Sequence, residues 1–197
     1  MKGTTVIEER MKLAIVIGSV REGRFGPTVA NWFAARAREH DEFTVDVIDL
    51  AGLDFPASMV SSPDVEDFGQ RIGNADAVVV VTPEYNHSYP GPLKTAIDSL
   101  GGQWHAKPIG LVSYGGISGG LRSIEPLRVV FAELHAMTIR ETVSFHGAWG
   151  QFDEDGQPRD PLGVNGAARV MLDQLAWWAW AIGEAKAVRP YGQKVAA

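Results

Sequence analysis

Two arginines stand in a short glycine-containing loop, Ser19 to Gly26, between an apolar run and a segment that begins as a helix. Arg21 and Arg24 can donate charge-assisted hydrogen bonds to phosphate oxygens. Unpaired backbone N–H groups at the start of the next helix, together with the helix dipole, also favour an anion. The loop predicts a site for a phosphorylated ligand; the alternative is a polar turn with solvated arginines.

A second unusual loop, residues 82–92, contains three prolines and two tyrosines. The prolines stiffen the backbone, and Tyr85 and Tyr89 offer flat faces with hydrogen-bonding tips. The loop is suited to one side of a planar aromatic ligand. A rigid structural turn with tyrosines packed on the surface is the alternative.

A third loop, Ser113 to Gly120, contains four glycines within eight residues. Glycine allows a ligand to approach the backbone closely, and the N–H groups of such a loop can bond to the carbonyl oxygens of a heterocycle. A flexible connection is the other interpretation.

The periodicity of the chain predicts five strands that alternate with five helices. The strands are expected at 12–18, 43–49, 77–81, 108–113 and 137–145, and the helices at 26–40, 65–72, 92–100, 121–135 and 164–185. Such alternation predicts an α/β fold, a parallel sheet with helices on both faces. Ligands bind beyond the carboxyl ends of such strands, so the three loops are expected to share one rim.

One domain is expected over residues 12–190, preceded by a flexible extension over residues 1–11 and interrupted by an exposed loop over 147–163. The start of the chain lacks the apolar core of a signal peptide, so the cytoplasm is the expected location. No apolar run approaches the ~20 residues of a membrane helix, so no membrane partner is expected.

Composition excludes several classes of function. A net charge of −6 argues against general nucleic-acid binding. The absence of cysteine excludes thiol chemistry and iron–sulfur clusters, so any redox chemistry must come from a cofactor. The five histidines lack metal-site spacing, and no metal is expected.

Three groups of residues together carry a family resemblance. They are Gly18-Ser19-x-Arg21, then Thr82-Pro83-Glu84-Tyr85-Asn86-x-Ser88-x-Pro90-Gly91-x-Leu93-Lys94-x-Ala96-Ile97-Asp98, and Ser113-x-Gly115-Gly116. Over residues 12–145 the chain resembles the NAD(P)H-dependent FMN reductase family of flavodoxin-like proteins, which includes quinone, azo-dye and chromate reductases. The resemblance implies a three-layer α/β/α fold with strand order 2-1-3-4-5, bound FMN, NADPH or NADH as donor, a small oxidant as acceptor, and a homodimer or homotetramer.

The resemblance also implies roles for individual residues. The FMN phosphate would lie in the first loop, and the flavin ring would lie between the other two. The residues implied are Ser19 and Arg21 at the phosphate, Pro83, Glu84, Tyr85 and Asn86 along the ring, and Ser113, Gly115 and Gly116 at its pyrimidine edge. The family often has Ser and Asn where this chain has Arg24 and Gly26, so we expect Arg24 and the amides of Phe25 and Gly26 to replace those donors.

The implied reaction passes a hydride from the nicotinamide to the flavin and then electrons to the acceptor, and it needs no catalytic acid or base from the protein. Arg122 and Arg128 are candidates for a 2′-phosphate, although solvated helix faces also carry such charges. The aromatic pair Trp177 and Trp180 suggests a subunit contact or a cover for the domain edge. Two other functions stay open: a flavodoxin-type electron carrier that takes no hydride directly, and a non-redox protein that binds a phosphorylated ligand.

Overall fold

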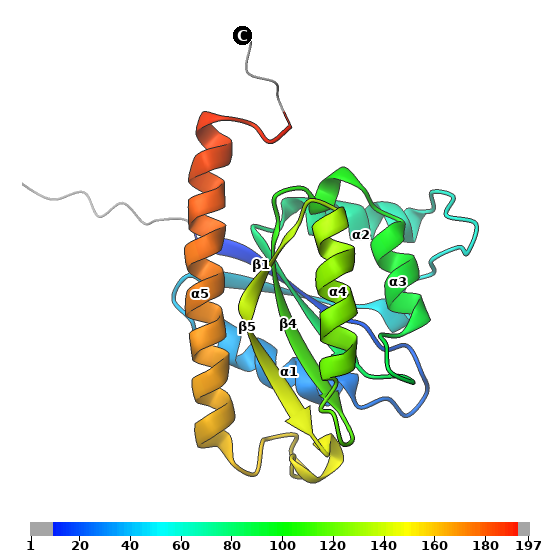
Figure 1. Cartoon of the computed structure of the whole chain (residues 1–197), viewed down its shortest axis with the longest axis vertical. Helices are drawn as coiled ribbons and strands as arrows, with labels where there is room; N and C mark the ends of the chain where they lie inside the picture. The colour runs from blue at the N-terminus through cyan, green and yellow to red at the C-terminus, as the bar shows by residue number, and fades with distance from the viewer. Residues whose placement is uncertain (1–9, 193–197) are drawn as a thin grey trace, which may run out of the picture.

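The computed structural model describes residues 10–192 and contains the ten predicted elements in the predicted order (Figure 1). Their bounds are β1 Met11–Ile17, α1 Gly26–Arg38, β2 Phe43–Asp49, α2 Pro63–Asn74, β3 Ala77–Pro83, α3 Gly91–Asp98, β4 Pro108–Gly115, α4 Leu121–Glu133, β5 Met137–His146 and α5 Pro161–Val188. Of the extension expected over residues 1–11, residues 1–9 lie outside the described part, and Met11 is the first residue of β1.

The five strands form one parallel sheet in the order β2-β1-β3-β4-β5, which confirms the flavodoxin-like topology. Every residue of β3 and β4 is buried, as expected for central strands that are apolar on both faces. In the register of the sheet, Ile17 pairs with Val81, and Thr82 pairs with Ser113. The loops that follow β1, β3 and β4 therefore leave the sheet at the same edge.

Alternate residues of each strand enter two separate hydrophobic cores. Ile15 and Val79 face the core closed by α1 and α5, whereas Val16 and Val80 face the core closed by α2, α3 and α4. Figure 1 shows α5 standing beside β5 on one side and α4 and α3 together on the other. The two helical layers hold the sheet from both faces and fix the edge from which the three loops emerge.

The segment expected as an exposed loop over 147–163 is partly buried. It contains a 3-10 turn, Ala148–Gly150, and α5 begins at Pro161, where proline suits the first helical turn. Phe152 is 4% exposed, and its ring centroid lies 4.9 Å from that of Phe145 and 5.5 Å from that of Phe25. These aromatic contacts hold the segment against the start of α1.

No helix within residues 10–192 has both the length and the apolar character needed to cross a membrane. The longest, α5, carries Trp177 and Trp180 on its outer side, with 58% and 59% of their surfaces exposed.

Candidate functional site

A pocket of about 310 Å³ lies where the loops after β1, β3 and β4 meet. Its lining residues are Arg21, Gly23, Arg24, Phe25, Pro83, Glu84, Tyr85, Tyr114, Gly115, Gly116 and Trp149. Its volume falls at the lower end of the range for small-molecule sites, roughly 300–1,000 Å³. The structure thus brings eight of the twelve predicted site residues to one pocket, and it adds Gly23, Tyr114 and Trp149.

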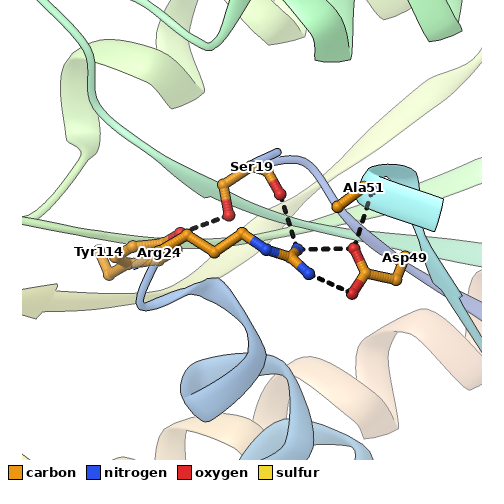
Figure 2. Close-up of polar contacts among 5 residues, drawn as sticks. All are labelled: Ser19, Arg24, Asp49, Ala51 and Tyr114. Atoms are coloured by element: carbon orange, nitrogen blue, oxygen red, sulfur yellow. Dashed lines mark hydrogen bonds and ion pairs between the residues drawn. The ribbon is translucent and has the colours of Figure 1, made fainter. Parts of the chain in front are cut away.

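Arg24 forms a bidentate ion pair with Asp49, the last residue of β2 (Figure 2). Nη1 and Nη2 donate to the two carboxylate oxygens at 2.6 Å each, and Nη1 also donates to the carbonyl oxygen of Ser19 at 2.7 Å. Burial opposes ionisation of Asp49, but the hydrogen bonds from Arg24 and from the backbone N–H of Ala51 outweigh it and hold the pKa of the carboxyl below its usual range. The ion pair ties the first loop to the neighbouring edge strand.

Ser19 is fully buried, and its hydroxyl accepts a 3.1 Å hydrogen bond from the hydroxyl of Tyr114 on β4. Burial raises the pKa of Tyr114 to about 12, so the phenol keeps its proton and remains a donor. Gly26 packs against both hydroxyls. Neither Ser19 nor Gly26 is among the pocket-lining residues, and these two predicted site residues instead shape the loop beneath the pocket.

Arg21 is exposed at the mouth of the pocket, with its guanidinium carbon 5.8 Å from the ring centroid of Tyr85. Such a cation–π contact attracts the guanidinium to the face of the ring, and the five N–H donors of an arginine can still bond to a ligand. No side chain of the described residues caps α1, whose N-cap residue, Phe25, lines the same pocket as Arg21. The mouth therefore combines an exposed cation with a helix N-terminus, a pairing that suits an anionic group.

Glu84 connects the second loop to the third. Its carboxylate accepts hydrogen bonds from Ser118 and, at 3.2 Å, from Nη1 of Arg122, and its side chain is 11% exposed. Burial raises the pKa of Glu84, but these two hydrogen bonds outweigh burial and keep the pKa below its usual range. Arg122 is thus paired with Glu84, while Arg128 donates to the backbone carbonyls of Ile139 and Arg140.

The second loop is a tight turn rather than an open connection. Tyr85 and Ser88 exchange backbone hydrogen bonds of 2.8 and 3.1 Å around Asn86 and His87, whose φ angles are 50° and 70°. Asparagine tolerates this left-handed conformation better than most residues. Asn86 is exposed and is not among the pocket residues, so its visible contribution is to the turn.

The third loop is held rigidly beneath its exposed tip. The hydroxyls of Ser113 and Ser144 both donate to the carbonyl oxygen of Gly119, at 2.8 and 2.7 Å. Gly119 has a φ of 62°, and a Cβ there would lie 2.6 Å from the Ser144 hydroxyl. Gly116, by contrast, faces open space. The buried Ser113 therefore fixes the loop through its hydrogen bond to Gly119, whereas Gly116 lines the pocket with its backbone.

Trp149 closes the pocket from the segment that follows β5, and it is 65% exposed. Its ring centroid lies 6.5 Å from that of Phe25, a residue of the first loop. The sequence carried one signal for it, an isolated tryptophan in a segment otherwise rich in polar residues and glycine. Its position opposite the first loop depends on the aromatic contacts of Phe152 and was not visible in the pattern.

Known proteins resemble this chain in both sequence and fold. A NADPH:quinone oxidoreductase of Arabidopsis thaliana is 30% identical over 90% of this chain and 96% of its own length. An FMN-dependent NADPH-azoreductase of Staphylococcus haemolyticus is 30% identical over 84% of this chain and 93% of its own length. An NAD(P)H-dependent FMN reductase of Schizosaccharomyces pombe is 37% identical over 55% of this chain, a match that spans 60% of that relative.

Among solved structures, the flavoenzyme NAD(P)H:(acceptor) oxidoreductase FerB of Paracoccus denitrificans has the same fold. It superposes with a TM-score of 0.70 at 21% identity and covers 87% of this chain and 98% of its own. The resemblance seen in the sequence is confirmed at the level of the family. Residues 11–150 match the NADPH-dependent FMN reductase family, and the chain belongs to that family.

Proposed function

We propose that this protein binds FMN in the pocket between its three loops and uses NADPH or NADH to reduce a small acceptor such as a quinone, an azo compound, chromate or free flavin. Membership of the family makes the chain an oxidoreductase of the FMN reductase class and implies a flavin cofactor. The observation that carries the proposal is the convergence of Arg21, Tyr85 and Gly116 on one pocket.

The residues of the pocket fit the two chemically different parts of FMN. Arg21 and the uncapped start of α1 offer donors and positive charge for a phosphate. Pro83 offers a stiff backbone, Tyr85 a flat side chain and Gly116 an open glycine. These features suit a planar ring that must be approached closely by the backbone.

The redox chemistry would be supplied by a flavin bound in this pocket, as hydride acceptance from a reduced nicotinamide and electron transfer to the acceptor. The protein holds the nucleotide, the flavin and the acceptor in one opening, where their reacting atoms are kept close and correctly oriented. We assign the backbone N–H groups of Gly115 and Gly116 to the edge of the ring where negative charge develops on reduction. The hydrogen bond from Ser118 to Glu84 keeps the second and third loops together while donor and acceptor exchange, and the ion pair with Arg122 ties the second loop to α4.

The subunit contact belongs to the same proposal. Trp177 and Trp180 are more than half exposed on α5, and exposed aromatic pairs of this kind are typical of interfaces. We assign this face to a dimer or tetramer contact. Sedimentation at micromolar concentration tests it, with a dimer or tetramer expected for the natural chain and a smaller species for W177E/W180E; a monomeric natural chain would contradict it.

A purified sample tests the proposed function directly. The apoprotein should quench the fluorescence of added FMN with a stoichiometry of one per chain, and the complex should oxidise NADPH or NADH when a quinone or azo dye is present. A panel of acceptors with both nucleotides then identifies the preferred pair. FMN binding without nucleotide oxidation would favour the electron carrier, and a chain without FMN affinity would favour a non-redox binding protein.

A further inference from the structure

We propose that Asp49 is a positioning residue for the first loop. It holds the guanidinium of Arg24 so that the second edge of that guanidinium stays available for the flavin phosphate. This inference rests on the proposed function. Asp49 comes from the end of β2, outside all three loops that form the pocket. It acts through Arg24, which does line the pocket.

The hydrogen bonds of Arg24 leave one side of its guanidinium unused. An arginine has five N–H donors in a fixed plane. In Figure 2, all three dashed lines from the guanidinium start at its two terminal nitrogens, two reaching Asp49 and one reaching the carbonyl of Ser19. The N–H of Nε and the second N–H of Nη2, on the adjacent edge, have no acceptor among the residues drawn. Two parallel donors on one edge form a fork that matches two oxygens of a phosphate.

The carboxylate that holds Arg24 is itself held by the backbone. Oδ1 of Asp49 accepts a 3.1 Å hydrogen bond from the N–H of Ala51, at the start of the 3-10 turn Leu50–Gly52. The guanidinium of Arg24 is thus held by two partners, the Asp49 carboxylate, which the backbone N–H of Ala51 fixes, and the Ser19 carbonyl of its own loop. A long side chain ordered before the ligand arrives loses less conformational entropy on binding, so the anchoring favours FMN.

This arrangement also accounts for the unusual residues of the loop. Gly26 has no side-chain donor, and the buried hydroxyls of Ser19 and Tyr114 occupy the space that one would need. Arg24 therefore adds side-chain donors that position 26 does not supply, beside those of Arg21. Because Asp49 neutralises Arg24, the net positive charge at the mouth comes from Arg21, which is exposed. Arg24 thus supplies hydrogen-bond donors in a fixed orientation, and Arg21 supplies the net positive charge.

The test compares the affinity of the apoprotein for FMN and for riboflavin, which lacks the phosphate, by titration of flavin fluorescence. In D49N the dissociation constant for FMN should rise about tenfold, the equivalent of one charge-assisted hydrogen bond, while that for riboflavin should stay within a factor of two. The matched control is D46N, which breaks the other bidentate pair of β2, between Asp46 and Arg71, and should change neither constant.

A double-mutant comparison separates positioning from a direct role. If Asp49 acts through Arg24, adding D49N to R24A should raise the FMN dissociation constant by less than a factor of two beyond R24A alone. R24K gives a second, independent variant, because lysine keeps the charge but lacks the fork. It should weaken FMN binding about as much as R24A, whether or not D49N is stable enough to titrate.

Several results would overturn the inference while leaving the proposed function intact. They are D49N or R24K binding FMN as tightly as the natural chain, D49N weakening riboflavin as much as FMN, or D49N and R24A acting additively. A natural chain that binds no FMN would instead overturn the proposed function, and this inference with it.

Discussion

The hydroxyl of Tyr114 donates a 3.1 Å hydrogen bond to the hydroxyl of Ser19 across 95 positions of sequence, and both side chains are buried. The α-carbon of Gly26 lies directly against them. A Cβ at position 26 would be 2.4 Å from the Ser19 oxygen and 2.8 Å from the Tyr114 oxygen. The identity of residue 26 is therefore set by a packing relationship between β4 and the first loop.

Replacing Gly26 with alanine should destabilise the fold. The added methyl group must displace two hydrogen-bonded oxygens, and overpacking of this kind costs about 1–3 kcal/mol in the free energy of unfolding. Urea denaturation measures the loss. As a matched control, G166A places the same methyl group in open space on α5, where alanine should raise the stability by a few tenths of a kcal/mol or more. Equal stability of G26A and the natural chain would show that the loop is not packed as described.

Replacing Arg21 with alanine should weaken the binding of FMN specifically. A hydrogen bond to a charged group contributes roughly 1.5–3 kcal/mol, so the dissociation constant should rise at least tenfold, with little change for riboflavin. The dependence of FMN affinity on salt should also become shallower, because the exposed charge is lost. R38A, an exposed arginine in the last turn of α1, serves as control. An unchanged FMN affinity in R21A would remove Arg21 from the phosphate site.

Replacing Glu84 with glutamine should loosen the connection between the second and third loops. The change keeps the shape of the side chain but removes the negative charge. The carboxylate that pairs with Arg122 and accepts a hydrogen bond from Ser118 becomes a neutral amide. We expect a loss of about 1 kcal/mol in stability and weaker binding of both FMN and riboflavin, because the proposed site of the ring lies between these loops. E125Q, at an exposed carboxylate of α4 with a 3.5 Å pair to Arg128, is the control. Tighter flavin binding in E84Q would contradict this role.

The Arg24–Asp49 pair predicts a specific dependence of stability on pH. The pKa of Asp49 is lower in the folded chain than its ordinary value of 3.8, so below that value the unfolded chain binds more protons and stability rises with pH. The contribution is complete above pH 3.8 and is lost as the pH falls through the lower folded pKa. The free energy of unfolding should exceed that of D49N by about 1 kcal/mol at pH 7, and the difference should shrink in acid. A difference that grew in acid would contradict the assignment.

The fold was predictable because its signals are local. Runs such as Val78 to Val81 are apolar on both faces, and helical spacing follows each strand, so alternation alone indicates the parallel sheet. The predicted ends of the elements were less accurate. The third strand was predicted to end at residue 81 and extends to Pro83, and the last helix was predicted from residue 164 and starts at Pro161. These ends depend on capping and on the neighbouring strand, which the pattern does not contain.

The site was predictable only in part, because its supporting contacts are long-range. Arg21, Tyr85 and Gly116 line the pocket as expected, since the carboxyl ends of parallel strands converge. The partner of Arg24 could not be identified from the sequence, because several acidic residues follow Arg24 at no recognisable spacing and only the sheet brings Asp49 to it. Tyr114 lies in a buried strand, where an aromatic residue reads as core, although its hydroxyl reaches the first loop.

The proposed function requires the chain to accept a hydride from a reduced nicotinamide through FMN bound in its pocket. Anaerobic mixing of the FMN-loaded protein with NADPH, and separately with NADH, tests it most directly by following the absorbance of the oxidised flavin. We predict that at least one nucleotide bleaches the bound flavin within seconds, and that adding a quinone restores the colour. A bound flavin that keeps its oxidised spectrum with both nucleotides would contradict the account.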